Sequence, residues 1–510
     1  PRQFPTASLA YTGTLVWDAP PPEAGTNISI IPYALGAVAK DYANKTGPDY
    51  RQHIGGDAKI SLTSSLNLDL TVNPDFSQVD VDQQVINLNR YELFFPEKRQ
   101  FFLENGDLFN NFGYADVRPF FSRRIGLNAP IEFGTRITGK INKSWRVGLM
   151  DIQTGHSNVN DVAAQNFGVL TLQRRVFSRS NIGLIVINKQ ATESAHGTGQ
   201  DYNRTAGLEY NLASSNNLWT GKLMGLKSFT PQVKNNDEVV AGHLQYLSKR
   251  WTVYLQHQYA GKNYNAEVGY IPRKGYQKIS PLLLHSFFPK SGLILSHGIQ
   301  LSSNYYFNEK FIRTDNESIL SYIVTFRNKS VLSFNGINDY VKLLKPFDPT
   351  NTGAAALPIG FENRWNTIDV QFTSKPQSVM TYLLDASYGG YYDMGKRING
   401  TAQIGYRFQP YVNISLNATY ADIRLPAPYG HNTFWLVGPR VDVTFTNTLY
   451  FTTFVQYNQQ IHNMNINTRL QWRYKPASDL FIVYGDNSET SPFAIKNRQL
   501  VLKWTYWWNI

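Results

Sequence analysis

The feature that most constrains this chain is a two-residue alternation of apolar and polar side chains, which is clearest near the C-terminal end. Within residues 464–475, apolar Leu470 and Trp472 alternate with arginine and glutamine side chains. The same alternation runs through residues 412–420 and 66–73. Because successive side chains of a strand point to opposite faces, each segment predicts a strand with one apolar and one polar face. A soluble antiparallel sandwich alternates in the same way, so this pattern alone establishes an all-β chain and leaves the architecture open.

The final strand favours a membrane barrel over a sandwich. It runs to the last residue, and Trp504, Tyr506, Trp508 and Ile510 share its apolar face. This strand resembles the terminal signal by which outer-membrane barrels are recognised for assembly, although that signal commonly ends in Phe or Trp. Other Tyr, Trp and Phe residues gather at strand ends, as in the interfacial girdles of such barrels. No run of about 18 apolar residues is present, so any membrane crossing must use strands.

The lengths of the connections predict the number of strands. Outer-membrane barrels alternate short periplasmic turns with longer extracellular loops. Eleven short turns are predicted near Ser64, Lys143, Arg179, Ser215, Lys249, Lys290, Asn328, Pro376, Pro410, Asn447 and Ala477. Longer loops are predicted near His156, Ala195, Asn235, Lys262, Asn308, Asn351, Gly395, Pro428, His462 and Glu489. With one further strand at either end, the chain forms a transmembrane antiparallel β-barrel of about 24 strands, within a range of roughly 22 to 26. Both termini then lie on the periplasmic side of the outer membrane of a Gram-negative bacterium.

Cysteine content and the first residues bear on compartment and domain organisation. The absence of cysteine excludes disulfides, thiolate metal sites and cysteine nucleophiles, and it suits an oxidising compartment. The chain starts at Pro1 without a basic and apolar leader, so we expect that a signal peptide and an upstream module have preceded it. Residues 1–27 are therefore assigned to an N-terminal segment or linker, and residues 28–75 and 129–510 to barrel strands.

One segment breaks the pattern of strands and turns. From Asn73 to Asn128 the chain is too long and too apolar for an ordinary loop. Because it lies between two strands, residues 76–128 are assigned to an extracellular insertion that enters the lumen as a plug or constriction, since side chains alone do not fill so wide a barrel. We call residues 76–128 the insertion. The residues assigned to its constriction are Arg90, Glu92, Phe94, Phe95, Glu97, Lys98, Arg99, Phe101, Phe102, Glu104 and Asp107.

The same segment carries a family resemblance. The run NPDFSQVDVDQQVINLNRYELFFPEKRQFFLENGDLF, followed by PFFSRRIGL, closely resembles the signature of an uncharacterised outer-membrane β-barrel family of Bacteroidota. The resemblance is specific over residues 30–127. It implies a C-terminal barrel domain of unknown function that follows a family-nine-like carbohydrate-binding module. That module is not visible in this chain, so the resemblance implies a location rather than a mechanism.

Basic residues recur on the polar faces of the predicted strands, which face the lumen. The lumenal basic residues are Arg123, Arg124, Arg136, Lys140, Arg407, Arg469, Arg473, Lys475 and Lys503. One interpretation is an anion-attracting conduit. The alternative is a closed lumen in which these bases neutralise the carboxylates of the insertion. The phenylalanines of the insertion likewise admit two interpretations, an aromatic slide for a sugar or lipid and a simple anchor.

Metal binding and catalysis have little support in the sequence. Asp75, Asp80 and Asp82 crowd oxygen ligands together, as a Ca²⁺ site requires, but the glycine and the bidentate glutamate of an EF-hand are missing. Turn formation and capping are the favoured explanation of these aspartates, so we expect no cofactor, and Ca²⁺ near Asp80 and Asp82 is the alternative. No GxSxG, HExxH or Walker-type motif is present, and we expect no enzyme.

Three functions follow from these observations. The first is a passive or gated conduit for glycan-related or anionic solutes. The second is a sealed scaffold subunit of a larger outer-membrane complex for secretion, nutrient uptake or barrel assembly. The third is a membrane-embedded hydrolase, which requires a serine and a histidine in contact. The expected partners are outer-membrane lipid, lipopolysaccharide, other outer-membrane proteins and glycans. Nucleic acid is excluded, because the bases behind the net charge of +12 are spread through strands.

Overall fold

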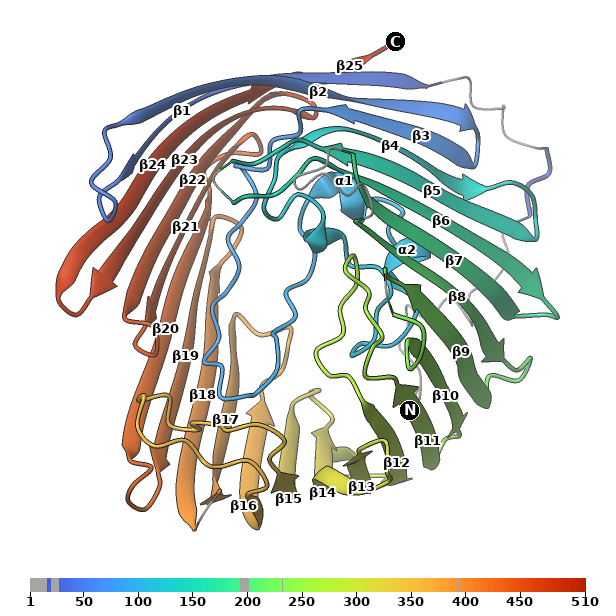
Figure 1. The fold of residues 1–510 in the computed structure, drawn as a ribbon, viewed down its shortest axis with the longest axis vertical. Coiled ribbons are helices and arrows are strands. Elements are labelled where there is room, and N and C mark those ends of the chain that lie inside the picture. Colours follow the sequence, from blue (N-terminus) through green and yellow to red (C-terminus); the bar gives the residue numbers. More distant parts are fainter. Residues whose placement is uncertain (1–15, 20–26, 159, 193–200, 232, 393) are drawn as a thin grey trace.

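The chain folds into a closed antiparallel β-barrel (Figure 1). The computed structural model describes residues 16–19, 27–158, 160–192, 201–231, 233–392 and 394–510. The sheet has 25 strands, of which the two-residue β25 continues β24 along β1. The wall is therefore 24 strands around, and β24 pairs with β1 to close it. This confirms the predicted fold class. Most of the predicted N-terminal segment, residues 1–27, lies outside the described residues.

The strands follow one another around the wall in sequence order, each antiparallel to the next. Their bounds are Ile28–Asp41 (β1), Asp49–Thr63 (β2), Leu66–Val72 (β3), Ile131–Lys140 (β4), Trp145–Thr154 (β5), Gln165–Val176 (β6), Ser180–Ala191 (β7), Tyr202–Ala213 (β8), Trp219–Phe229 (β9), Glu238–Leu247 (β10), Trp251–Ala260 (β11), Tyr276–Phe287 (β12), Ile294–Phe307 (β13), Arg313–Phe326 (β14), Val331–Lys342 (β15), Glu362–Thr373 (β16), Met380–Tyr391 (β17), Gly395–Phe408 (β18), Val412–Arg424 (β19), His431–Thr444 (β20), Leu449–Asn458 (β21), Asn463–Lys475 (β22), Ser478–Thr490 (β23), Phe493–Thr505 (β24) and Trp508–Asn509 (β25).

The eleven predicted short turns all fall between strands, at one end of the barrel, which we call the turn end. β1 begins and β24 finishes at this same end. Three of the predicted longer loops are wrong, because the connections near Gly395, His462 and Glu489 are short. Regular pairing continues to the rim there, and Glu489 itself belongs to β23. The predicted loop near Ala195 lies outside the described residues.

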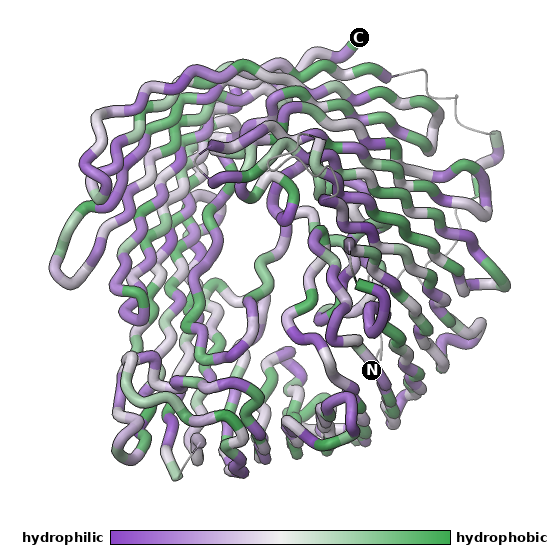
Figure 2. Tube along the Cα trace, viewed as in Figure 1, coloured by the Kyte–Doolittle hydropathy of each residue, from purple (hydrophilic) through white to green (hydrophobic). Residues whose placement is uncertain are grey.

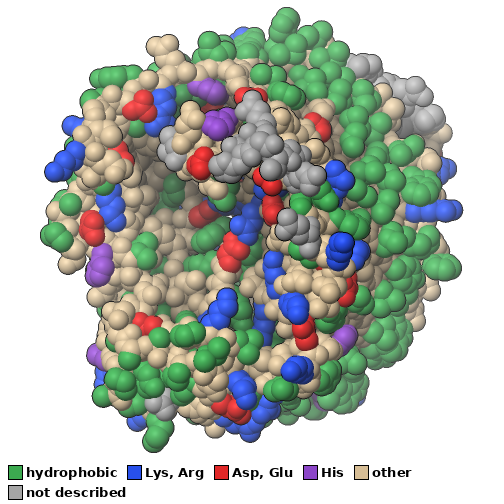
Figure 3. Space-filling model, in the orientation of Figure 1, with side chains coloured by type: hydrophobic (Ala, Val, Ile, Leu, Met, Phe, Trp, Pro, Cys, Tyr) green, Lys and Arg blue, Asp and Glu red, His purple; other side chains and the backbone are tan. Residues whose placement is uncertain are grey.

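The outer surface of the wall is apolar. Aliphatic side chains such as Leu223, Leu208 and Ile368 point outward and are more than half exposed. Exposed outward aromatics, including Trp251 and Trp472, stand near the turn end. Figure 2 shows the resulting alternation of hydrophobic and hydrophilic residues along the strands. In Figure 3 the flank at the right is largely hydrophobic, while charged side chains are visible within the ring. Among the described residues, no helix is long and apolar enough to cross a membrane.

The residues between β3 and β4 lie inside the ring of strands (Figure 1). They contain two short helices, Gln100–Leu103 (α1) and Asp107–Asn110 (α2), and a 3₁₀ turn at Ser122–Arg124. The main hydrophobic core of the molecule forms where this segment meets the inner wall of β5 to β11. The largest apolar core of this wide barrel therefore lies on one side of its lumen.

Candidate functional site in the barrel lumen

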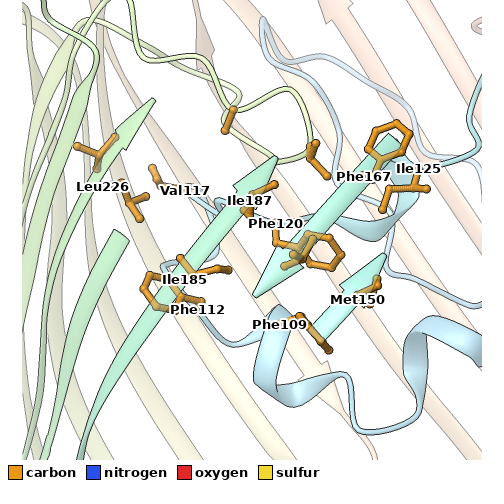
Figure 4. Packing of buried hydrophobic residues seen from close by; sticks show 14 of the residues in the cluster. Phe109, Phe112, Val117, Phe120, Ile125, Met150, Phe167, Ile185, Ile187 and Leu226 are labelled. Carbon is orange, nitrogen blue, oxygen red and sulfur yellow. The ribbon is translucent and has the colours of Figure 1, made fainter. Parts of the chain in front are cut away.

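The second part of the insertion, residues 97–125, is fixed by burial. We call it the anchored half. Phe102, Phe109, Val117 and Ile125 are almost completely buried. They pack against inward-facing apolar residues of the wall, as Figure 4 shows for Phe109, Phe120 and their neighbours. The wall contributes Met150, Ile152, Phe167, Val169, Ile185, Ile187, Met224 and Leu226. An apolar stripe on the polar side of the wall therefore exists where the anchored half covers it.

A buried ion pair organises the chain inside the anchored half. The Glu97 carboxylate accepts hydrogen bonds from the Arg99 guanidinium at 2.7 Å and from Ser122 Oγ at 2.6 Å. Arg99 also donates to the carbonyl oxygens of Ser122 and Ile125, at 2.6 and 2.8 Å. Burial raises the pKa of Glu97, but these hydrogen bonds outweigh it and leave the pKa below its usual value. The carboxylate is therefore ionised and holds two distant parts of the segment together.

The first part of the insertion, residues 77–96, has no helix or strand and crosses the lumen as an extended chain (Figure 1). We call it the strap. Its backbone is held by glutamine side chains of the far wall, because Gln456 accepts from Gln84 N at 2.6 Å and Gln460 accepts from Asn87 N at 3.0 Å. Ile86 and Leu88 pack against a second, smaller hydrophobic cluster beside β15 to β20.

Ion pairs tie both parts of the insertion to the wall. In the strap, Asp80 pairs with Arg469 at 2.8 Å and with Arg440 at 3.2 Å, and Arg90 pairs with Asp315. Further pairs join Glu104 to Lys59, Asp107 to Arg146 at 2.8 Å, and Asp116 to Lys278 at 3.0 Å. Just before the insertion, Asp75 pairs with Lys503 at 3.1 Å. The contacts reach strands on every side of the lumen.

Most of the predicted lumenal basic residues form ion pairs with carboxylates of the wall or of the insertion. Arg469 and Lys503 bind the aspartates just named, and Arg136, which is 1% exposed, pairs with Asp69 of the adjacent strand at 2.7 Å. Further pairs join Arg473 to Asp479, Arg123 to Asp82 and Arg124 to Glu92. Among the described residues, Lys140, Arg407 and Lys475 have no ion-pair partner, and Lys475 lies over the Tyr506 ring. The pattern matches the neutralising interpretation more closely than that of an open basic path.

The predicted aromatic residues serve as anchors. Phe94 packs on Phe121 and on Tyr270, with ring centroids 4.9 and 5.2 Å apart, and Phe102 is buried beside Phe101. Phe95 is half-buried. At the boundary of the two parts, Lys98 donates to the Val81 carbonyl at 2.8 Å and pairs with Asp82 at 3.2 Å.

The three aspartates considered for calcium do not share a site. Asp75, Asp80 and Asp82 each bind basic residues of different elements. Within the described ranges, no three acidic, histidine or cysteine side chains gather in a way that would hold a metal ion. The three aspartates thus form salt bridges in this structure, whereas their spacing in the sequence suggested a shared Ca²⁺ site.

A cavity of about 780 Å³ lies between the strap and the wall of β12 to β18, at the end opposite the short turns. We call it the loop-end cavity. Its size falls in the range of ordinary ligand sites. Aromatic rings line it together with charged and amide side chains. Its principal lining residues are Arg90, Tyr91, Glu92, Phe94, Asp116, Tyr270, Arg273, Tyr276, Asn304, Tyr306, Asp315, Glu317, Asp339, Trp365, Tyr391, Tyr392, Arg397 and Asn399.

Sequence reasoning found the strap side of this cavity and missed its wall side. Arg90, Glu92 and Phe94 were predicted for the constriction, whereas Glu317, Asp339 and Trp365 were not recognised. These three residues lie on polar faces of regular strands and form no local motif. Only the register of the sheet places them in one row, since Glu317 is opposite Asp339 and Asp339 is opposite Trp365.

The described histidines offer no hydrolytic pair. Their hydrogen-bonding partners are tyrosine, amide, backbone and aspartate groups, as for His243 with Tyr114 and His431 with Asp422, both at 3.0 Å. No histidine within the described ranges has a hydrogen bond to a serine hydroxyl, which the hydrolase alternative requires.

The predicted assembly strand lies at the closure of the barrel. Trp504 points outward beside Tyr506, while Trp508 is opposite Ile30 of β1. The Ile510 amide donates to the Ile28 carbonyl at 2.9 Å. The terminal residues thus complete the seam of the wall, and their role in assembly stays a prediction.

The comparison with family models matches part of the chain and names no activity. The family described as a domain of unknown function (DUF5916) matches residues 24–147, which include β1 to β4 and the insertion. The residues that carry the family resemblance, 30–127, fall within this range. No curated protein matches the chain.

Solved structures similar to this chain include receptors and one further protein. The siderophore receptor PirA from Acinetobacter baumannii is 9% identical, with a TM-score of 0.41 over 94% of this chain and 80% of that one. A mutant ferric enterobactin receptor, PfeA from Pseudomonas aeruginosa, is 10% identical, with a TM-score of 0.44 over 96% and 82%. OccAB4 from Acinetobacter baumannii is 10% identical, with a TM-score of 0.32 over 95% and 99%.

Proposed function

We propose that this chain is a transport barrel of a Gram-negative outer membrane and that its strap gates the lumen. The observation that carries the proposal is the unequal attachment of the insertion. The anchored half is buried in the main hydrophobic core, while the strap crosses the lumen on polar contacts and a few apolar side chains. A segment held in this way can leave the wall without unfolding the rest.

Placement in the membrane is supported by the outer surface. A closed wall leaves no sheet edge, and its outward aliphatic residues form a continuous apolar band with aromatics near the turn end. Such a surface needs lipid around it, with lipopolysaccharide as the outer-leaflet partner. We propose that the short turns face the periplasm, as in outer-membrane barrels, so that the loop-end cavity opens at the cell surface.

The solute class follows from the loop-end cavity. Its aromatic rings and amide side chains favour a polar, hydroxyl-bearing solute, in keeping with a glycan-related one. An anionic solute has weaker support, because most of the predicted lumenal basic residues bind carboxylates. The proposal is therefore a gated conduit for polar solutes rather than an anion pore.

The sealed scaffold is the second candidate, and its supporting observation is the set of ion pairs that joins the insertion to several strands. A scaffold needs a permanent seal and other outer-membrane proteins as partners. The two candidates differ in one measurable property, which is whether release of the strap opens a path.

A reversible lock tests this property, because the chain has no cysteine of its own. The variant carries Asn87→Cys and Gln460→Cys, whose parent residues are joined by hydrogen bonds of 3.0 and 2.9 Å. Planar-bilayer conductance is measured before and after reduction, with each single-cysteine variant as a control. We expect closure on oxidation and opening on reduction. If the reduced and parental proteins stay silent, and deletion of the strap alone opens the barrel, the scaffold replaces the gate.

A further inference from the structure

The loop-end cavity has two neighbouring carboxylates on one part of its wall. Glu317 of β14 and Asp339 of β15 are directly opposite each other, and neither has an ion-pair partner among the described residues. Like charges directly opposite on paired strands destabilise a sheet. Such a pair therefore needs a reason beyond the stability of the wall.

The other acidic residues of the cavity are neutralised. Asp315 binds both Arg90 and Arg273, the latter at 2.6 Å. Asp116 binds Lys278 and Glu92 binds Arg124. These arrangements leave the two carboxylates of the β14–β15 pair as the free acceptors in the described lining.

One lining cation, Arg397 of β18, has no acidic partner among the described residues. Its guanidinium stacks over the Tyr391 ring, 4.5 Å from the centroid, rather than on either free carboxylate. Counted with their ion-pair partners, the charged residues of the lining balance, because Asp315 binds two arginines. The negative charge is therefore local to the Glu317 and Asp339 pair, and it is this part of the wall that attracts positive charge.

Aromatic rings stand beside the free carboxylates. Trp365 is directly opposite Asp339, and its ring lies 6.0 Å from that of Tyr391 and 4.9 Å from that of Tyr392. Rings next to carboxylates form the usual surroundings of an organic cation, since the ring face attracts positive charge.

The negative wall continues along the lumen toward the turn end. Asp369 of β16 follows Trp365 by four residues, about 13 Å at roughly 3.3 Å per residue, and Asp385 lies on β17 opposite Gln371. The outward exposure of Ile368 and Leu384 places both aspartates on the inner face. Both carboxylates accept a hydrogen bond from a side-chain amide. Neither carboxylate has an ion-pair partner among the described residues.

We propose that the loop-end cavity binds an amine-bearing, positively charged solute, which the Asp369 and Asp385 carboxylates then attract along the lumen. The ammonium group donates to Glu317 and Asp339, and its carbon skeleton packs on Trp365. This inference rests on the proposed function, since it names the solute of the same conduit, and it adds a cation preference to the polar solute class proposed above. Rows of carboxylates are a general means of selecting cations in a pore.

Calorimetric titration of the detergent-solubilised full chain with spermidine tests the binding step without requiring conduction. We expect saturable binding that weakens at least about tenfold in the Glu317→Gln, Asp339→Asn double variant, the scale of one lost charge-assisted contact. Glu489→Gln, on β23 away from the cavity, is the matched control. Equal losses in both variants, or binding of citrate as tight as that of spermidine, would overturn the inference.

Reversal potentials of the reduced, unlocked barrel under a KCl gradient test the path itself. Cation preference that falls in Asp369→Asn and Asp385→Asn supports the proposal, and anion preference contradicts it. If spermidine binds while the barrel never conducts, the gated conduit fails and the amine site stands. If the barrel conducts but does not bind spermidine specifically, the gated conduit stands and the amine site fails.

Discussion

The anchored half and the strap belong to one insertion, but they are held by different forces. Residues 97–125 bury phenylalanine and isoleucine side chains against the inner wall, whereas residues 77–96 rely largely on partly exposed ion pairs and side-chain amides. Burial of one large side chain contributes about 2 kcal/mol, while an exposed ion pair contributes at most about 1 kcal/mol. The difference indicates that the anchored half is the more strongly attached part of the insertion and that the strap is the weaker one.

The largest effect is expected when the apolar packing of the anchored half is removed. Phe109→Ala deletes a ring that is 1% exposed and is expected to destabilise the anchored half by about 4 kcal/mol. Hydrogen exchange of residues 101–125 measures this loss against the barrel strands. Phe445→Ala removes an exposed ring near the turn end and serves as control. Equal exchange in the two variants would mean that the core does not hold the insertion.

Removing the internal ion pair has the next largest effect. Glu97→Gln leaves the Arg99 guanidinium buried without its carboxylate, which is expected to cost about 3 kcal/mol. Protease cleavage between residues 97 and 125 measures the opening. The exposed pair of Asp49 and Arg51 supplies a control, because Asp49→Asn is expected to change little. Protection unchanged by Glu97→Gln would assign the stability to apolar packing alone.

Acidification sharpens the comparison, because it acts on charge and leaves apolar packing in place. Burial raises the pKa of Glu97 and of Asp82, yet hydrogen bonds from Arg99 and Arg123 lower both values below normal. The stabilisation is therefore complete above the unfolded values, about 4.3 for Glu and 3.9 for Asp, and is lost as pH falls through the folded values. Hydrogen exchange across this range should show the strap released before the anchored half. Release in the reverse order would contradict the distinction.

The smallest effect is expected for a single strap tether. Asp80→Asn removes the partner of Arg440 and Arg469, and because these groups are one-fifth to one-third exposed the expected cost is about 1 kcal/mol. That energy corresponds to a roughly fivefold rise in the open fraction, measurable as channel open probability. Arg498→Gln breaks a pair within the wall and is the control. An open probability insensitive to Asp80→Asn would show that the polar tethers do not set the gate.

Local pattern was sufficient for the wall. The alternation around Trp472 and the turns near Ser64 and Ala477 are properties of a few neighbouring residues, and the structure has strands and turns at those places. The sequence also predicted that the side chains of Lys503 and Arg469 point into the lumen, because alternation fixes the face of a side chain once its neighbour is known to be apolar. The partners of these bases were not readable, since Asp75 and Asp80 are about 400 residues away along the chain.

What the sequence by itself determined about this protein is thus its class, its approximate strand number and the existence of an insertion, all of which depend on short-range periodicity. Only the tertiary structure decided which charges are neutralised and which remain free. Glu317, Asp339 and Trp365 form one row because three strands pair in a particular register, and the strap closes the cavity over them. Charge selectivity depends on such distances across the lumen, and a linear chain does not specify them until the barrel closes.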